Sequence, residues 1–473
     1  MYRAPFSCLS AFLLASCAGS EPVVLTSPPE KFVSANANGG DVAIPQWLEA
    51  LEDPFLDTLV ERALADNLEI DQASARVEQA RAGARLTRTA LLPRTDLRAG
   101  MSRDRISEAT AGLGALAGDE NSGINFPNPA DTFDVGGDLI WELDLFGANK
   151  KALRVARAEL VAVRADRQAS ELRIAAEVAR TYFEARRAEA LIAISKQQLS
   201  ARRRIIDITT AKVRFGDALP ETLLQERRAL ADLESDAQVH QADLAAAQFA
   251  LAVLLALEPV ELLALWKDSE STDPRMLYLP SPGEVLSARP DIVAAEYRLR
   301  AANGQVDVEI AEYYPKIQLG ASIGSQAEDP GDLLTQRSQT FSIGPSLNWR
   351  ILDFGAIDAA VAQARGAEKE AYADYRLAML RAIEEIEREV SRFGALSDVL
   401  VSRTQIAELK RAEVAIARAK YEFGDIERLA LLREELEFQN QEMQEAIARA
   451  DLFISYSVLA KALGGAQTLS SPG

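Results

Sequence analysis

The residues that could perform chemistry are few, and their order along the chain supports no common catalytic arrangement. Residues 320–324 read GASIG, which matches the G-x-S-x-G turn that carries the nucleophilic serine of many hydrolases. That turn needs a strand before it, a helix after it and a histidine later in the chain. The single histidine, His240, precedes this serine, and the residues after Gly324 read SQAEDPGD rather than a helical pattern. We therefore predict that the protein is not an enzyme.

The same scarcity argues against a metal centre. The chain has one histidine and two cysteines, Cys8 and Cys17, and both cysteines lie within the first 17 residues. These residues cannot supply the nitrogen and sulfur ligands of a structural or catalytic zinc site. We expect no metal and no cofactor, and we interpret His240 as a partly exposed packing residue.

Composition narrows the class of protein further. The 473 residues include 52 Lys and Arg against 71 Asp and Glu, which gives a net charge of −19. A nucleic-acid binder would carry a basic balance instead. With 48% hydrophobic, 6% aromatic and 26% charged residues, the chain has the composition of a folded protein rich in helix.

The N-terminus has the form of a secretion signal. Residues 1–16 combine Arg3 with an apolar run that is too short for an ordinary membrane anchor. The sequence LASC at 14–17 looks like the bacterial lipobox, in which the cysteine receives a covalent lipid. We expect Cys17 to be the lipid anchor, with residues 17–52 as a lipid-anchored extension. Ala18 favours sorting to the outer membrane; the alternative is a cleavable signal that happens to contain a cysteine.

An internal repeat organises the remainder of the chain. LIWELDLFG at 139–147 aligns with LNWRILDFG at 347–355, an offset of 208 residues, and the same offset places Phe215-Gly216-Asp217 on Phe423-Gly424-Asp425. LLPRTDL at 91–97 aligns with YYPKIQL at 313–319. We therefore predict a first repeat at 53–273, a second at 274–465 and a short tail at 466–473.

Each repeat carries two segments in which apolar and polar residues alternate. Phe133, Val135, Leu139 and Trp141 alternate with polar or small residues, and Phe341, Ile343, Leu347 and Trp349 do the same. Alternation of this kind predicts strands, and the loop-like stretches 104–132 and 326–337 would be their exposed tips. Four strands of about ten residues fit a transmembrane β-sheet, although the alternation alone also fits a soluble antiparallel sheet. Four strands cannot close a barrel in lipid, so several chains must share it.

The segments that follow these strands are helical. Residues 148–214 and 356–422 contain no proline, and helices of that length would extend roughly 100 Å. Each should break at a turn marked by Gly216 and Asp217, or by Gly424, and return over 221–257 and 426–463. The first returning helix has a coiled-coil seam, made by Leu223, Leu230, Leu233, Ala237, Leu244, Ala247, Leu251 and Leu254.

Taken together, these features resemble the outer-membrane factor family, which is TolC-like, and in particular its OprM/NodT-like lipoproteins. The resemblance covers nearly the whole mature chain. Its motifs are the lipobox at Cys17, DPFLDTLVERALADN at 53–67, WELDLFG at 141–147, RPDIVAAEYRLRAA at 289–302, WRILDFG at 349–355 and YEFGD at 421–425.

The resemblance implies a mainly α fold with a transmembrane β portion. A homotrimer would form a twelve-stranded outer-membrane β-barrel, which continues as a long α-helical barrel in the periplasm. It implies an exit duct for passive efflux of small molecules, joined to a periplasmic adaptor and an inner-membrane pump of the RND type. Trp141 and Trp349 would lie in the interfacial aromatic belt of the barrel.

The resemblance also points to a gate at the periplasmic end. Relatives carry an acidic residue nine positions after the glycine of the turn, but here that position is Arg433, followed by Glu434 and Glu435. Either these glutamates act together with Asp425 and Glu427 as an acidic constriction, or a network of Arg433 with acids holds the end shut. A third interpretation is that all of these residues are solvated turn residues.

Two alternative functions remain open from the sequence. The same duct could serve a type I protein secretion system. A periplasmic coiled-coil adaptor is a weaker alternative, because an adaptor normally has one helical hairpin whereas this sequence predicts two.

Overall fold

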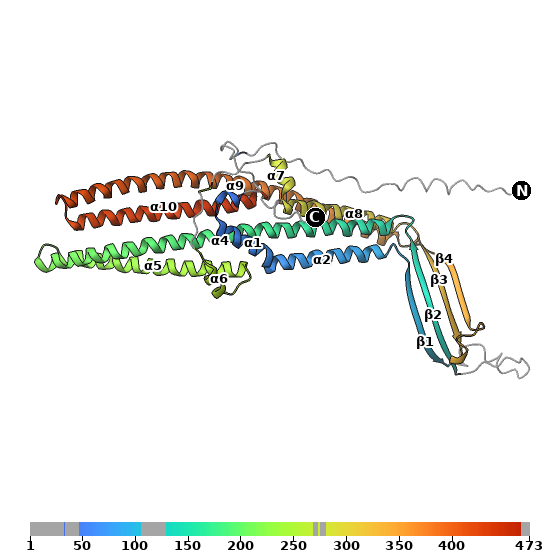
Figure 1. The fold of residues 1–473 in the computed structure, drawn as a ribbon. Helices are drawn as coiled ribbons and strands as arrows, with labels where there is room; N and C mark the ends of the chain where they lie inside the picture. Colours follow the sequence, from blue (N-terminus) through green and yellow to red (C-terminus); the bar gives the residue numbers. More distant parts are fainter. Residues whose placement is uncertain (1–32, 34–46, 106–128, 268–272, 275–280, 465–473) are drawn as a thin grey trace, which may run out of the picture. The chain divides into compact units, whose positions relative to one another are not determined.

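The computed structural model describes residue 33 and residues 47–105, 129–267, 273–274 and 281–464. The signal segment 1–16, Cys17 and the tail 466–473 lie outside the described residues, as do most of the extension 17–52 and much of the first tip loop. The elements follow one another as α1 (Pro54–Asp66), α2 (Leu68–Thr89), β1 (Arg94–Asp104), β2 (Ala130–Leu143), α4 (Ala148–Phe215), α5 (Pro220–Leu254), α6 (Pro259–Leu265), α7 (Pro282–Ala288), α8 (Pro290–Ala311), β3 (Lys316–Ala327), β4 (Gln339–Asn348), α9 (Phe354–Glu422) and α10 (Arg428–Ala462) (Figure 1).

The described residues divide into two compact units, and each unit contains parts of both repeats. The sheet unit comprises residues 78–161 and 297–372, and the helical unit comprises residues 47–77, 162–296 and 373–464. The repeat boundaries 53–273 and 274–465 therefore remain a prediction about sequence organisation.

The four strands form one antiparallel sheet in the order β1-β2-β3-β4. Residues directly opposite each other on paired antiparallel strands share a face, so the register defines two faces. One row across the sheet contains Leu97, Gly137, Ile323 and Phe341, and the row beside it contains Asp96, Asp138, Ser322 and Ser342. The alternation that the sequence predicted is confirmed: the sheet has an apolar face and a polar face.

The apolar face is left exposed by the part of the chain that the structure describes. Leu97 is 86% exposed, Ile323 is 72% exposed and Phe341 is 84% exposed. Within the described part of the chain, β1 and β4 are edge strands, since each pairs with one neighbour. A sheet with this much exposed apolar surface requires another apolar environment.

Two glycines allow β2 and β3 to come close together. Gly136 and Gly324 are opposite each other. A Cβ atom added to Gly324 would lie 2.8 Å from the carbonyl oxygen of Val135, and one added to Gly136 would lie 2.9 Å from that of Ile323. Only glycine fits at these two positions without a shift of the backbone.

The sheet unit also contains one end of each of four helices, which pack side by side. Lys151 of α4 donates to the backbone oxygen of Asp307 in α8 at 3.3 Å. A Cβ atom added to Gly304 of α8 would meet a methyl group of Val155 at 2.9 Å, so α4 and α8 are in close contact. On the other side of α8, Asn303 donates to Glu368 of α9 at 2.6 Å.

The core of the helical unit surrounds two fully buried tyrosines, Tyr182 of α4 and Tyr456 of α10. The rings of Phe183 and Phe453 stack with centroids 4.5 Å apart and join the same two helices. Tyr182 donates a hydrogen bond of 2.7 Å to Asp53, whose carboxylate also caps the start of α1. The N-terminal end of α1 is therefore attached to the long helix α4.

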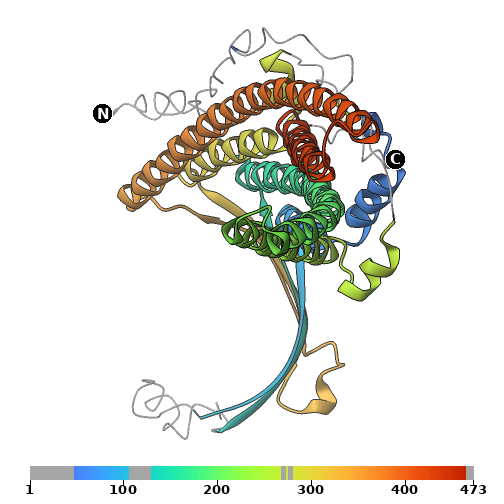
Figure 2. The ribbon, with the colours of Figure 1, turned by 90° about the vertical axis from the view of Figure 1, so that its left-hand side faces the viewer.

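The long helices expected from the sequence are confirmed, with α4 containing 68 residues and α9 containing 69. Each returns as a helix of 35 residues, α5 or α10. The predicted seam of α5 is the less exposed side of that helix, with Ala237, Ala247 and Leu251 buried. Figure 2, which looks along the long helices, shows α10 between α9 and α4.

Membrane-spanning helices can be tested for length and apolar composition. Among the described residues, no single helix passes this test, and one pair, α5 with α6, passes it only when the two are joined across a bend of 103°.

Candidate functional site

The two hairpin turns are closed by the same backbone arrangement. Gly216 and Gly424 have φ angles of +81° and +83°, a left-handed conformation that glycine adopts most easily. The N–H of Asp217 donates to the oxygen of Lys212 at 2.8 Å, and the N–H of Asp425 donates to that of Lys420 at 2.8 Å. This is the bond of a Schellman helix end. The repeated Phe-Gly-Asp sequence thus stops both long helices in the same way.

A buried glutamate lies beside these turns, on the seam between the hairpins. Glu226 of α5 is 8% exposed. Its Oε2 accepts a hydrogen bond from Arg202 of α4 at 2.5 Å, and its Oε1 accepts one from Arg433 of α10 at 3.3 Å. One carboxylate therefore joins both helices of the first hairpin to the second hairpin.

Further polar contacts cross between the same hairpins. Lys212 of α4 forms an ion pair with Glu427, which precedes α10. Further along α4, Gln198 donates to Asn440 of α10 at 2.8 Å. Arg187 and Asp451 form an ion pair at 3.2 Å. We call the contacts of Glu226, Arg433, Lys212 and Glu427 the hairpin latch.

Apolar side chains support the hairpin latch. Ala201 and Ile205 of α4 are buried against Leu432 and Leu436 of α10. These residues alternate along the two helices with the polar ones named above. Because the apolar contacts set the spacing of α4 and α10, the charged groups of the latch are held within bonding distance.

The five predicted gate residues have three kinds of surroundings in the structure: contact with the first hairpin, contact within the second hairpin, and, for Asp425, an exposed turn. Arg433 and Glu427 contact the first hairpin, as described. Glu434 and Glu435 instead pair with their own hairpin, accepting from Lys410 at 2.8 Å and from Arg418 at 3.0 Å.

Asp425 is exposed in the turn, where its backbone N–H donates to the oxygen of Lys420. Within this one chain, Arg433 contacts Glu226 of the first hairpin. The adjacent Glu434 and Glu435 instead pair with residues of α9, in their own hairpin.

Glu226 and Arg202 were not predicted from the sequence. A signal for Glu226 was present: the predicted seam jumps by seven residues from Leu223 to Leu230, and Glu226 fills the skipped seam position. A charge at a buried seam position needs a partner. The identity of that partner depends on how two distant hairpins dock, which the sequence pattern did not show.

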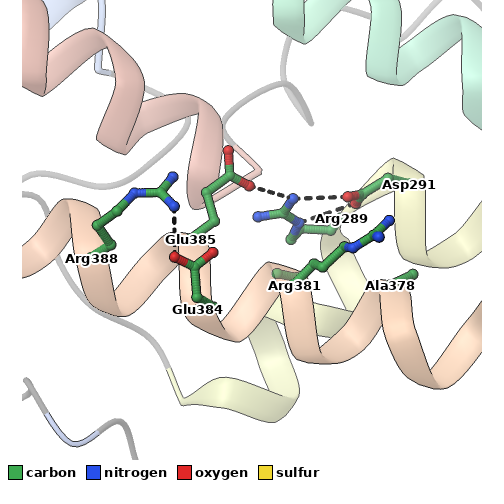
Figure 3. Close-up of a pocket in the computed structure, with 8 residues that line it drawn as sticks. Arg289, Asp291, Ala378, Arg381, Glu384, Glu385 and Arg388 are labelled. Carbon is green, nitrogen blue, oxygen red and sulfur yellow. Dashed lines mark hydrogen bonds and ion pairs between the residues drawn. The ribbon is translucent and has the colours of Figure 1, made fainter.

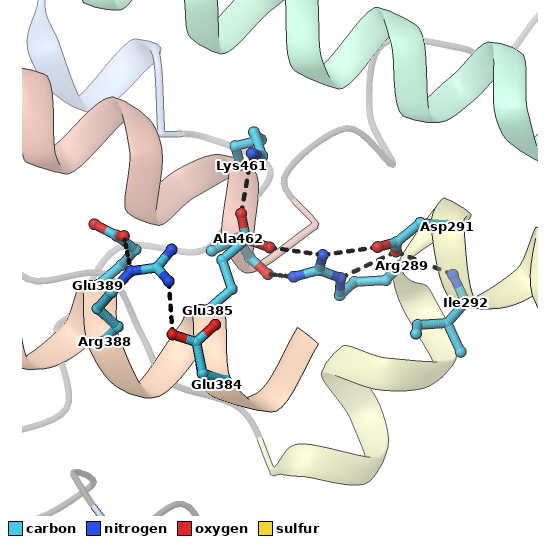
Figure 4. A network of polar contacts seen from close by, with 9 residues as sticks. All are labelled: Arg289, Asp291, Ile292, Glu384, Glu385, Arg388, Glu389, Lys461 and Ala462. Carbon is cyan, nitrogen blue, oxygen red and sulfur yellow. Dashed lines mark hydrogen bonds and ion pairs between the residues drawn. The ribbon is translucent and has the colours of Figure 1, made fainter. Parts of the chain in front are cut away.

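A second polar cluster surrounds Arg289, the first residue of the RPD motif. Its guanidinium donates to Asp291 at 2.8 Å, to Glu385 of α9 at 2.8 Å and to the backbone oxygen of Ala462 at 2.6 Å. Lys461 also pairs with Glu385 at 3.0 Å. Figure 4 shows this network, which holds the start of α8, the middle of α9 and the end of α10 together.

The same residues line a pocket of the helical unit. Arg289 spans from Asp291 to Glu385 along one side, while Arg381 and Ala378 of α9 line the other (Figure 3). Burial alone would raise the pKa of Glu385, but the hydrogen bonds and charges of Arg289 and Lys461 outweigh burial and hold that pKa below its ordinary value. The opposing charges are paired with each other, so the arrangement is suited to fixing helices rather than to binding a ligand.

The two predicted aromatic residues lie at the junction of sheet and helices. The indole N–H of Trp141 donates to the backbone oxygen of Leu91 at 3.2 Å. The indole N–H of Trp349 donates to that of Tyr313 at 3.0 Å. Leu91 and Tyr313 are equivalent positions of the two repeats, each two residues before the proline that precedes a strand. Each tryptophan therefore ties a returning strand to the segment that enters the sheet.

No group of three or more potential metal ligands occurs among the residues that the structure describes. Cys17, the predicted lipid anchor, lies outside them.

Comparison with known proteins identifies the family to which the chain belongs. The outer membrane efflux protein family matches residues 59–257 and 281–465. The chain belongs to this family. Outer membrane efflux proteins are channels of the bacterial outer membrane that extend into the periplasm. The sequence-based predictions of the family, the TolC-like fold, the efflux function and the outer-membrane location are confirmed, whereas the lipid anchor on Cys17 stays a prediction.

Individual relatives cover nearly the whole chain. The pyoverdine export outer membrane protein OpmQ of Pseudomonas aeruginosa is 29% identical, over 97% of this chain and 96% of the relative. Nodulation protein T of Rhizobium leguminosarum is 28% identical, over 95% of this chain and 89% of the relative. The solved outer-membrane channel OprN is 27% identical with a TM-score of 0.82, over 94% of this chain and 98% of that one. This outer membrane efflux protein is therefore similar to these three proteins over 94–97% of its length.

Proposed function

We propose that three copies of this outer membrane efflux protein form the exit duct of a tripartite efflux system. Each copy would give four strands to a twelve-stranded barrel, whose apolar face contacts lipid and whose polar face lines the pore. The observation that carries the proposal is the exposed apolar face of a sheet with two edge strands. An open sheet edge is too costly in lipid to persist, so neighbouring copies must pair with β1 and β4.

The duct would pass small molecules and perform no catalysis. It would bind no metal or cofactor, apart from the covalent lipid that we propose on Cys17. The periplasmic ends of the hairpins would contact an adaptor protein, which in turn joins an inner-membrane pump of the RND type. Relatives whose names refer to export of pyoverdine or toluene support small molecules as cargo in preference to the proteins of a type I secretion system.

We further propose that the hairpin latch holds the periplasmic end in its resting state. Opening would move the second hairpin away from the first, and adaptor contacts would favour the open arrangement. Arg433 crosses between the hairpins, whereas Glu434 and Glu435 pair within the second hairpin. The position of Arg433 in relation to Glu226 therefore supports the interpretation of Arg433 as part of an acid network that holds the end shut.

The test is the conductance of the purified full-length protein in planar bilayers. We expect a small, cation-preferring conductance for the wild type, a larger one for Arg433→Ala, and a smaller change for Glu434→Ala/Glu435→Ala. Absence of any channel, together with migration of the unheated protein as a monomer, would contradict the duct itself. Wild-type currents in both variants would remove these residues from the gate and leave the duct intact.

The cargo and the anchor require separate measurements. Deletion of the gene should increase sensitivity to dyes, detergents and antibiotics, whereas loss of a secreted protein with unchanged sensitivity would favour type I secretion. Metabolic labelling with palmitate should mark the wild type and not Cys17→Ala. Labelling of Cys17→Ala would show that the lipid is attached elsewhere.

A further inference from the structure

Six cations surround the place where the first two strands of the sheet unit meet their helices. Arg81, Arg85 and Arg88 lie in the last turns of α2, before β1, and Lys150, Arg154 and Arg157 lie in the first turns of α4, after β2. All six side chains are exposed. We call these six residues the basic collar.

The charges of the basic collar are not paired with any other residue that the structure describes. None of the six forms an ion pair with another described residue among the pairs found in the structure. Lys150 lies in the first turn of α4, where the carboxylate of Asp144 accepts hydrogen bonds from the backbone N–H groups of Asn149 and Lys150. The first turn of α4 contains no acidic residue. The six side-chain charges of the collar therefore remain without an ion pair among the described residues.

The two halves of the collar share one face of the α2 and α4 pair. Ala84 lies five residues before the end of α2 and Leu153 five residues after the start of α4, and both are buried. Because β1 and β2 pair, the helix ends next to these strands are neighbours. Ala84 and Leu153 therefore lie at the same distance from the sheet along their helices.

The cations of α2 lie three residues before, one residue after and four residues after Ala84. The cations of α4 lie at the same three offsets from Leu153. In an antiparallel pair of helices, equal offsets from facing residues lie on the same side of the pair. The six cations therefore form one continuous patch.

Contacts of α4 show which side of the sheet this patch faces. Asn149 donates to Glu142 at 3.1 Å, and Glu142 lies on the polar face of β2, since Trp141 beside it belongs to the apolar face. At about 100° per residue, Arg154 lies roughly 140° around the helix from Asn149. Lys151 and Val155, which contact α8, occupy the third side. The collar is thus turned away from the polar face of the sheet and toward the side of its apolar face.

The height of the collar matches the surface of a membrane. At 1.5 Å per residue, its cations lie within about 14 Å of the ends of their helices next to the strands. The headgroup layer on each side of a bilayer is roughly 5–8 Å thick, and long basic side chains extend toward it. The nearest acids on these helices form no ion pair with the collar among the described residues: Glu78 lies one turn beyond Arg81, and Glu159 lies on the other side of α4.

We propose that the basic collar binds the phosphate groups of anionic phospholipids in the periplasmic leaflet of the outer membrane. The inference rests on the proposed function, since that function places the apolar face of the sheet in lipid. Guanidinium groups bind phosphate oxygens in pairs, and basic residues just outside a membrane-spanning segment attract anionic lipid. The collar would fix the depth and tilt of each subunit in the bilayer.

The experiment measures retention of lipid by the full-length protein. Purified protein is incubated with phosphatidylglycerol or phosphatidylcholine, and bound lipids are counted by native mass spectrometry. We expect the wild type to prefer phosphatidylglycerol and Arg85→Gln/Arg88→Gln/Lys150→Gln/Arg154→Gln to lose at least tenfold of that preference. The charge-conserving variant Arg85→Lys/Arg88→Lys/Arg154→Lys should retain most of it.

A matched control removes four cations far from the strands. Lys196, Arg204, Arg227 and Arg228 are exposed residues of α4 and α5, and their combined change to glutamine should alter lipid preference by less than twofold. Equal losses in the control and collar variants would attribute binding to total charge and overturn the proposal.

Channel measurements on the same proteins separate this inference from the proposed function. If the wild type forms channels and the collar variant keeps its lipid preference, the inference alone fails. If the collar variant instead changes the cation selectivity of the channel with its lipid preference intact, the collar lines the duct and the proposal is overturned. If the wild type forms neither trimers nor channels, the proposed function fails first.

Discussion

Arg433 of the second hairpin donates a hydrogen bond of 3.3 Å to Glu226 of the first, although 207 positions separate them in the sequence. Glu226 has a second partner, Arg202, at 2.5 Å. The carboxylate is largely buried whereas the side chain of Arg433 is about half exposed. Arg202 belongs to the same hairpin as Glu226 and holds that carboxylate in place, whereas Arg433 contributes the bond that crosses between the hairpins.

The first prediction concerns this carboxylate. Glu226→Ala should favour the open state by about 1–2 kcal/mol, because the charge-assisted hydrogen bond from Arg433 across the hairpins is lost, and should raise the open fraction about 5–30-fold. Single-channel recording measures that fraction. Glu234→Ala is the matched control, since Glu234 lies on the same helix and pairs with Arg203 of the same hairpin at 3.1 Å. Equal effects of both changes would contradict a specific latch.

The second prediction concerns the stability of the helical unit. The side chain of Arg289 is 8% exposed and pairs with Asp291 and Glu385. Arg289→Ala should lower the free energy of unfolding by about 2–3 kcal/mol, because Glu385 then loses one of its two cations and the backbone oxygen of Ala462 loses its donor. Arg381→Ala removes an exposed arginine from the wall of the same pocket and should change stability by less than about 0.5 kcal/mol. Denaturant unfolding followed by circular dichroism distinguishes the two.

The third prediction concerns the dependence of the free energy of unfolding on pH. The pKa of Glu385 in the folded protein is lower than its ordinary value of 4.5, so its ionised form stabilises the fold. That contribution is fully present above the unfolded pKa and is lost as the pH falls through the folded pKa. Unfolding of the wild type and of Glu385→Gln should therefore differ at pH 7 and converge toward pH 3. A difference that stays constant over this range would show that Glu385 does not titrate with unfolding.

The fourth prediction concerns the close contact of β2 and β3. Gly324→Ala would place a Cβ atom 2.8 Å from the oxygen of Val135, whereas a Cβ atom at Gly344 meets nothing within 4 Å. We expect Gly324→Ala to reduce the yield of heat-modifiable oligomer in outer-membrane fractions several-fold, because the backbone of the sheet must shift. Gly344→Ala should leave the yield near that of the wild type. Wild-type yields of both would show that the sheet adapts to the added methyl group.

The sequence by itself determined the elements that depend on local patterns. Alternation of residues such as Phe341 and Ile343 with polar ones specifies strands, because successive side chains point to opposite faces. The absence of proline over residues 356–422 and the glycine at 424 specify one long helix and its end. The repeat of these features in both halves was sufficient to predict the fold and the family.

Only the tertiary structure decided which charged residues meet. Arg433 was singled out from the sequence as a departure from the family pattern, but its partner Glu226 belongs to the other hairpin. Two of the three partners of Arg289, Glu385 and Ala462, also come from distant parts of the chain. Likewise, the basic collar became one patch only once β1 paired with β2. Local patterns fix the direction of a side chain on its own helix, whereas the docking of hairpins, set by apolar contacts such as Ile205 with Leu432, fixes the distance between charges on different helices.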